Sequence, residues 1–394
     1  MTCNVCGREI VAGEPFIEGK DCYICTGCSE EIGRIWARSA GIEIWDPEVA
    51  NEELHLHTPV EIKEYLDRYV IGQDEYKRTI AVAIYNHYKR IMKHSDVPIK
   101  KANALVLGNS GSGKTYVVQK ISEYLDVPIA ICDATTLTEA GYVGDDVESV
   151  LVKLYQAADY DITRAEHGIV FIDEIDKIAR KGGNPSITRD VSGEGVQQGL
   201  LKMIEGNIIG IPPHGGRKHP EQELVYIDTK NILFICAGAF EGIEQRIGQR
   251  LNQHSIGYTT TEKKHYTDDE LLSKVTPSDL RAFGLIPEII GRLPVITHTN
   301  KLSESDLIHI LKDTDECLVK QYEALLKMDD CQLTFDDDAL EEIARYAVKA
   351  GTGARGLQHI MEKVMNDELY EIPSSGIKET IISLDKVKER LKDE

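Results

Sequence analysis

The residue types best suited to chemistry lie in a glycine-rich segment, Gly108-Asn109-Ser110-Gly111-Ser112-Gly113-Lys114-Thr115. Its spacing is that of a P-loop, in which glycines let successive backbone N–H groups turn toward phosphate oxygens. Lys114 would reach the β- and γ-phosphates, and the Thr115 hydroxyl would ligate Mg²⁺. A chance glycine-rich turn would seldom carry the complete motif, so the sequence predicts a nucleotide site.

A second candidate for chemistry is a pair of carboxylates at the end of an apolar run, in residues 168–174. The run predicts a buried strand that ends in Asp173 and Glu174. Beside a P-loop, the first acid can hold Mg²⁺ and its water shell, while the second can activate an attacking water. An acidic helix cap is the alternative, and the P-loop in the same chain favours the catalytic interpretation.

The third candidate is a group of cysteines near the N-terminus. Five of the nine cysteines lie in the first 28 residues, and the other four are scattered. Cys3-x-x-Cys6 and Cys25-x-x-Cys28 are knuckles separated by 18 residues, which is the spacing of a four-thiolate zinc site. Cys22-x-x-Cys25 is a competing knuckle, but we predict ligation by Cys25 and Cys28. Redox cysteines without a metal are the remaining alternative.

These residues have to be positioned by regular elements. Apolar runs at 104–107, 128–132, 168–172 and 230–236 predict buried strands, and 117–125 predicts a helix whose N-terminus favours an anion. Thr58 before Pro59 predicts a helix start, and residues 74–93 and 146–157 have helical character. From Val295 onward we expect a strand, one long helix at 303–326, a strand at 332–335, a helix at 339–349 and a last helix after 351–356.

Several segments between these elements predict loops. Residues 69–73 form an apolar turn that could pack on a nucleotide base. Residues 138–145 place Tyr142 and Val143 between glycines, which predicts a mobile loop with an exposed aromatic tip. Glycine-rich stretches at 181–195 and 211–220 predict two more loops, the second with a basic triplet, Arg217-Lys218-His219. A polar insertion follows at 255–268.

Composition limits the class of protein. The chain has 394 residues, is 42% hydrophobic and 28% charged, and has room for two or three domains. Its net charge of −21 argues against a broad nucleic-acid-binding surface. No window has the roughly 18 apolar residues of a membrane span, and no secretory signal is visible, so we expect a cytoplasmic protein without a membrane partner.

In combination, these motifs closely resemble the ClpX family of AAA+ protein unfoldases, which feed a ClpP-type peptidase. The resemblance covers almost the whole chain, in the family's order. A P-loop alone is common to many ATPases, whereas Gly-Tyr-Val-Gly followed by Arg-Lys-His is far more restrictive. The motifs that carry it are the cysteine knuckles, residues 69–73, the P-loop, residues 141–144, Asp173-Glu174, Arg217–His219, residues 286–294 and Gly353-Ala354-Arg355.

The resemblance implies an α/β fold with three domains. These would be a zinc-binding N-domain at 1–45, a linker at 46–58, a large AAA+ domain with a parallel sheet at 59–294, and a mostly helical lid at 295–394. ATP, Mg²⁺ and Zn²⁺ would be the cofactors. The P-loop with Asp173, Val70 and Ile71 would bind ATP·Mg²⁺, and Glu174 would polarise the water.

The resemblance also implies an assembly, a homohexameric ring with nucleotide between subunits. Arg292 would be an arginine finger acting across the interface, and Arg355 the sensor-2 arginine of the same subunit's lid. Tyr142 and Val143 would grip substrate in the pore. The 190–196 stretch would be a second pore loop, and Arg217, Lys218 and His219 would lie at the pore entrance.

One departure concerns the partner. The family docks ClpP through Ile-Gly-Phe, whereas this chain has Ile256-Gly257-Tyr258. A phenol entering an apolar pocket needs a hydrogen-bond partner, so docking could be weakened or retuned to another peptidase. The leading interpretation is an unfoldase with a peptidase partner and possibly adaptors. The alternatives are a remodelling ATPase that degrades nothing and a scaffold that binds ATP only as a structural ligand.

Overall fold

The computed structural model describes residues 2–9, 16–19, 22–25, 28–29, 32, 56–93, 95–138, 145–180, 193–213, 224–253 and 266–392. The chain divides into two compact units, Met1–His55 and Leu56–Glu394, and each is considered by itself. Among the described residues, no helix combines the length and apolar character that a membrane span needs.

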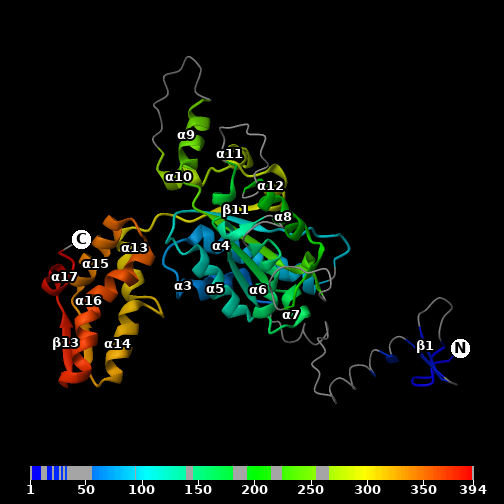
Figure 1. The fold of residues 1–394 in the computed structure, drawn as a ribbon, viewed down its shortest axis with the longest axis horizontal. Coiled ribbons are helices and arrows are strands. Elements are labelled where there is room, and N and C mark those ends of the chain that lie inside the picture. Colours follow the sequence, from blue (N-terminus) through cyan, green and yellow to red (C-terminus); the bar gives the residue numbers. More distant parts are fainter. Residues whose placement is uncertain are drawn as a thin grey trace. The chain divides into compact units, whose positions relative to one another are not determined.

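A five-stranded parallel sheet forms the centre of the larger unit, with strand order β11-β3-β10-β7-β4 (Figure 1). Parallel strands covered by helices on both faces are apolar throughout rather than alternating, and β3 and β10 are completely buried. The strands are β3 (Ala104–Leu107), β4 (Ile129–Asp133), β7 (Ile169–Asp173), β10 (Leu233–Gly238) and β11 (Val295–His298). All five lie at positions where the sequence predicts strands.

Helices pack around this sheet. Thr58 caps α3 through a capping box with Glu61, and Pro59 is the first helical residue, as predicted. Helix α5 begins at Lys114, three residues before the predicted start, so the P-loop lysine lies in its first turn. The helices are α3 (Pro59–Asp67), α4 (Asp74–Met92), α5 (Lys114–Leu125), α6 (Ser149–Ala157), α7 (Ile162–Glu166), α8 (Glu194–Glu205), α9 (Ile243–Gln253), α10 (Asp268–Leu272), α11 (Pro277–Phe283) and α12 (Pro287–Arg292).

Short elements connect these helices and strands. A hairpin of β8 (Ile208–Ile211) and β9 (Val225–Asp228) is antiparallel, and β5 (Leu137–Thr138) pairs with β6 (Asp145–Asp146). Three 3₁₀ turns complete the set, η1 (Ala134–Thr136), η2 (Ile175–Ile178) and η3 (Thr229–Asn231). The loop predicted at 181–195 ends earlier than expected, because α8 begins at Glu194.

The structure moves the start of the lid. We expected it at residue 295, but β11 (Val295–His298) pairs with β3 along its whole length and is therefore the edge strand of the central sheet. Its first residues follow Pro294, and the Val295 N–H donates to the Asn103 carbonyl at 3.3 Å. The sheet's hydrogen bonds thus hold residues 295–298 in the large domain.

The lid after β11 has its own core of helices around a two-stranded sheet, coloured orange to red in Figure 1. The single helix predicted at 303–326 is wrong, since two helices occupy that stretch. The polar residues 313–316 and the buried Cys317 lie between them. The elements are α13 (Glu304–Lys312), α14 (Leu318–Met328), β12 (Gln332–Phe335), α15 (Asp337–Ala350), α16 (Ala354–Ser375), β13 (Glu379–Ile382) and α17 (Leu384–Arg390).

The smaller unit contains a hairpin of β1 (Phe16–Gly19) and β2 (Cys22–Cys25). A second short bridge joins Thr2 to Glu9, and it closes a turn in which the Gly7 N–H donates to the Cys3 carbonyl at 2.9 Å. Asn4 ties this turn to the hairpin, because its side chain accepts from the Tyr23 N–H at 2.8 Å. The first cysteine turn and the end of β2 are therefore held together.

Candidate functional site

The P-loop curls between β3 and α5, at the carboxyl end of the central sheet. Lys114 Nζ donates to the Gly108 and Asn109 carbonyls at 2.6 and 2.9 Å. Burial lowers the pKa of Lys114 because it penalises the charged ammonium. An anion placed beside Lys114 would offset this penalty and favour the charged form. Helix α5 has no side-chain cap within the described chain, which leaves its first N–H groups for a ligand.

Two glycines of the P-loop are required by close contacts. Gly108 has φ +147°, and a Cβ there would lie 1.9 Å from the Thr299 hydroxyl, which follows β11. Gly111 has φ +74°, and a Cβ there would lie 2.4 Å from the Thr352 carbonyl of the lid. The loop is therefore packed between the last strand of the sheet and the lid, and only glycine allows both approaches.

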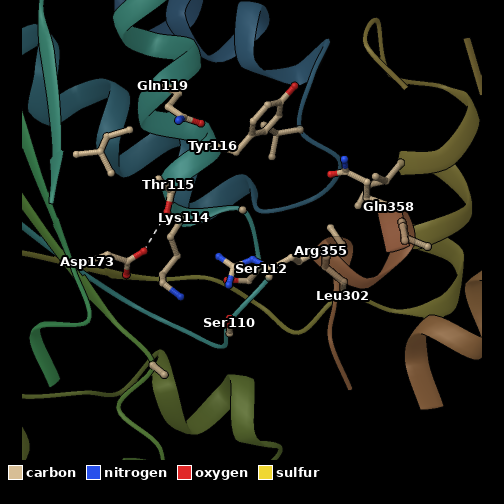
Figure 2. Close-up of a pocket in the computed structure, with 18 of the residues that line it drawn as sticks. Ser110, Ser112, Lys114, Thr115, Tyr116, Gln119, Asp173, Leu302, Arg355 and Gln358 are labelled. Atoms are coloured by element: carbon tan, nitrogen blue, oxygen red, sulfur yellow. Dashed lines mark hydrogen bonds between the residues drawn. The ribbon is translucent and has the colours of Figure 1, made fainter. Parts of the chain in front are cut away.

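The metal-binding candidates meet at the ends of α5 and β7. The Thr115 hydroxyl donates to Asp173 Oδ2 at 3.0 Å, drawn as the dashed line in Figure 2. The other carboxylate oxygen of Asp173 accepts from the Glu174 N–H at 2.9 Å. A hydroxyl and a carboxylate side by side are the hard oxygen ligands that Mg²⁺ prefers, so this pair fits the ion.

Glu174 has an unusual backbone. Its φ is +56°, in the left-handed region, and its side chain is exposed beside the cavity. A non-glycine residue there costs roughly 1–2 kcal/mol, and such strain tends to be kept at functional positions. Glu174 thus lines the cavity directly after Asp173, the residue that bonds Thr115.

A cavity of about 1020 Å³ surrounds these groups and is shared with the lid. Val70 and Ile71 line it, and Arg355 enters it from the first turn of α16. Figure 2 shows Arg355 extending from the lid toward the P-loop. The Ala354 N–H donates to the Gly111 carbonyl at 3.1 Å, so the lid contacts the P-loop directly. Of the predicted ATP-site residues, those lining the cavity are Val70, Ile71, Ser110–Thr115, Asp173, Glu174 and Arg355.

Several cavity residues escaped the sequence analysis. Gln358 lies three residues after Arg355 on α16, a spacing that could have identified it. Asp176 is buried beyond Glu174 and accepts from the Ala239 N–H at 3.1 Å. Tyr116 follows Thr115 and bonds Glu316 of the lid at 3.3 Å. Leu302 and Glu316 come from the stretches on either side of α13, and nothing local in the sequence marks them.

Arg292 is not among the residues of this cavity. It ends α12 on the surface, where Nε and Nη2 donate to Glu205 Oε1 at 3.2 and 2.9 Å. The structure therefore separates Arg292 from Lys114, Asp173 and Glu174 of its own subunit, whereas it brings Arg355 to them.

The N-terminal cysteines gather into one cluster. The Sγ atoms of Cys3, Cys6, Cys25 and Cys28 all lie within 4.8 Å of one another, and Cys6 and Cys25 are 3.8 Å apart. Tetrahedral Zn–S bonds of about 2.3 Å require S···S separations of about 3.8 Å, so the four thiols fit zinc. Cys22 is outside the cluster because it lies three positions before Cys25 on β2, and odd spacings along a strand point to opposite faces.

The thiols also need a cation. Backbone N–H groups, that of Cys25 first, lower the pKa of Cys3 to about 6. Contact with Cys6 and the other neighbouring thiols raises the pKa of Cys28 to about 12. Four thiolates would therefore repel one another without a positive ion between them, which is the chemistry that a structural zinc supplies.

Several predicted site residues lie outside the described residues. They are Tyr142 and Val143, the triplet Arg217, Lys218 and His219, and the loop Ile256, Gly257 and Tyr258. Of the 190–196 stretch, residues 193–196 are described, and Glu194 and Val196 belong to the first turn of α8.

Two family models match the chain. Residues 99–296 match the model described as "AAA domain (Cdc48 subfamily)", and residues 302–387 match "C-terminal, D2-small domain, of ClpB protein". The first match ends at residue 296, within β11, and the second begins at residue 302, after that strand.

Curated relatives match nearly the whole chain, and the three described here are each named "ATP-dependent Clp protease ATP-binding subunit ClpX". The one from Bacteroides thetaiotaomicron is 50% identical over 394 residues, with 99% of this chain and 95% of the relative covered. The Porphyromonas gingivalis protein is 49% identical over 385 residues, covering 96% and 93%. The Borrelia duttonii protein is 48% identical over 392 residues, covering 98% and 90%.

Proposed function

The chain belongs to the ClpX family, and we propose that it is an ATP-driven unfoldase that threads polypeptides through the pore of a homohexameric ring. It is an ATPase. The observation that carries the proposal is the junction of Thr115 and Asp173 at 3.0 Å, with Glu174 and Arg355 at the same cavity. An unfoldase needs hydrolysis coupled to movement, and this cavity lies between two domains that can shift with its contents.

Each group has one role in the proposed hydrolysis. The P-loop N–H groups and Lys114 hold the phosphates, while Thr115 and Asp173 hold Mg²⁺. Glu174 accepts a proton from the attacking water, and its exposed side chain lies beside the cavity. Arg355 contacts the γ-phosphate and so couples the nucleotide to the lid. It is placed for this because the preceding residue, Ala354, donates its N–H to the P-loop.

We assign Arg292 to the neighbouring subunit's nucleotide. Its distance from its own cavity and its place at the end of a surface helix support a role across the interface. In the transition state its guanidinium would neutralise charge on the transferred phosphoryl group.

We expect Arg292→Ala to bind ATP normally and to hydrolyse it at least about tenfold more slowly. Mixed with Glu174→Gln subunits it should regain activity, because each variant completes a site that the other lacks. ATPase assays over a series of mixing ratios test this. If no mixture exceeds the sum of the separate variants, Arg292 does not act in trans.

We propose that Tyr142 and Val143 grip substrate in the pore, with Arg217, Lys218 and His219 at its entrance. The unfolded polypeptide would pass to a ClpP-type peptidase that docks through Ile256, Gly257 and Tyr258. A remodelling ATPase without a peptidase is the second candidate, favoured by Tyr258 in place of the family's phenylalanine. Degradation of a tagged folded protein, with and without a candidate ClpP, separates the two. Unfolding without any degradation would favour the remodelling ATPase.

We propose that Cys3, Cys6, Cys25 and Cys28 bind one zinc ion per subunit. Metal analysis should find zinc lost in Cys25→Ser and kept in Cys22→Ser, because only the first removes a thiol of the cluster. The described residues of this unit form only a small apolar cluster, so zinc removal should also unfold it, which circular dichroism of the chelated protein would detect. Zinc kept by Cys25→Ser would refute the assignment.

We assign the protein to the cytoplasm. All nine cysteines lie within the described residues and have free thiols. A thiolate cluster with isolated, mostly buried thiols suits a reducing compartment.

A further inference from the structure

We propose that Glu205 is a positioning residue for Arg292, holding the guanidinium in the orientation that the neighbouring nucleotide needs. The inference rests on the proposed role of Arg292 in trans, and it assigns the cause of that arginine's geometry to a carboxylate on another helix. Glu205 ends α8, whereas Arg292 ends α12, so the contact joins two helices that approach each other at their last turns.

The contact uses one edge of the guanidinium. Nε and Nη2 of Arg292 both donate to Glu205 Oε1, at 3.2 and 2.9 Å. Within the described part of the chain, Nη1 has no hydrogen-bond partner. An arginine held by its Nε edge keeps its remaining donors for a phosphate while losing rotamer freedom, which is the condition for a preorganised electrostatic contact.

The backbones of both residues are fixed by one buried side chain. Asn103 is 2% exposed, and its Nδ2 donates to the carbonyls of Ile204 at 3.3 Å and Arg292 at 3.0 Å. Its Oδ1 accepts from the Phe234 N–H at 3.2 Å. Asn103 therefore places the residue before Glu205 and Arg292 itself against the start of β10. It also directly precedes β3, the strand that leads into the P-loop.

Glu205 occupies an electrostatically unfavourable place. The C-terminus of a helix carries partial negative charge and favours basic residues, yet α8 ends in a carboxylate before its left-handed cap Gly206. A residue that breaks a local rule is expected where function requires it. The positive charge of Arg292 offsets the negative charge that Glu205 adds to this helix end.

The contact is poorly suited to stabilising the fold. The side chains of Arg292 and Glu205 are 54% and 36% exposed, and exposed ion pairs contribute little to stability. We therefore expect loss of the pair to change the orientation of the Arg292 side chain and to leave the free energy of unfolding nearly unchanged. The pair of Arg345 with Glu304 has similar exposure, 50% and 43%, and lies in the lid, so it offers a matched control.

The test compares Glu205→Ala and Glu205→Gln with Glu304→Ala in full-length hexamers. We expect Glu205→Ala to lower kcat about fivefold with an unchanged KM for ATP, because the finger is misplaced only for the transition state. Glu205→Gln keeps an acceptor oxygen and should recover part of the rate. Glu304→Ala should match the wild type, and thermal unfolding should be alike for all three. A Glu205→Ala rate equal to or above that of the wild type overturns the inference.

Mixed rings distinguish positioning in trans from damage to the variant's own site. Glu174→Gln subunits carry an intact Glu205–Arg292 pair but cannot hydrolyse their own ATP. Mixing them with Glu205→Ala subunits should therefore raise the hydrolysis rate per subunit that keeps Glu174. Glu205→Ala in the Arg292→Ala background should have no further effect. A defect that mixing does not relieve, or that adds to Arg292→Ala, overturns the inference.

The same experiments separate failure of this inference from failure of the proposed function. Normal turnover in Arg292→Ala would refute the finger, and the positioning role with it. A slow Arg292→Ala beside a normal Glu205→Ala would leave the finger in place and refute only the role of Glu205.

Discussion

Replacing Glu174 with glutamine is expected to leave ATP binding intact and to lower the hydrolysis rate at least about 100-fold. Lys114, Thr115 and Asp173 would still hold ATP·Mg²⁺, because none of their contacts involves the Glu174 side chain. The amide cannot accept a proton from the attacking water. Nucleotide-binding titrations and steady-state ATPase assays on the same preparation measure the two quantities.

Asp126→Asn provides the matched control. Asp126 is also an exposed acidic residue with positive φ, +50°, but it lies after α5 and away from the cavity. The same carboxylate-to-amide change there should leave turnover unaltered, since asparagine tolerates this backbone region. Hydrolysis at the wild-type rate in Glu174→Gln would refute the assignment of the catalytic carboxylate.

Replacing Tyr142 with alanine is expected to abolish unfolding of a stably folded substrate while hexamers and ATP hydrolysis persist. In the proposed role, the aromatic ring grips any polypeptide by apolar contact and shape. Translocation requires that grip, whereas hydrolysis does not. An already unfolded chain needs less force, so its translocation should be less affected.

Tyr142→Phe is the control, because it keeps the ring and removes only the hydroxyl. It should unfold the folded substrate at close to the wild-type rate. Fluorescence loss from a tagged fluorescent protein, with ATPase activity measured in parallel, reports both functions. Normal unfolding by Tyr142→Ala would show that this loop is not the grip.

The chemistry of the large domain was readable from the sequence because its determinants are local. Residues 104–115 and 168–174 each combine a strand with the functional residues that follow it, and parallel strands bring those residues to one edge of the sheet. Arg355 was found through a motif. Leu302 and Glu316 of the lid were not, since only the tertiary arrangement brings them to the cavity.

The errors have similar physical causes. The sequence at 295–298 reads equally well as a strand of either domain, and only pairing with β3 assigns it. The polar break at 313–316 was too short to end the helical pattern by itself, and packing in the lid separates α13 from α14. The choice of Cys25 with Cys28 agrees with the cluster, and strand alternation supplies the reason that spacing alone could not.

Glu205 illustrates what periodicity cannot reveal. In the sequence it is one more acidic residue at a helix end, 87 positions from Arg292. The helix ends are brought together by Asn103, a buried amide whose three partners come from three different elements. Such a contact follows from the fold and not from the local pattern.

The most direct test of the account is unfolding of a tagged, stably folded fluorescent protein by the intact hexamer, measured as fluorescence loss without a peptidase and with a trap for unfolded chains. The account predicts loss that requires hydrolysable ATP and disappears in Glu174→Gln. Active ATP hydrolysis without any loss of fluorescence, for tagged substrates at either terminus, would contradict it.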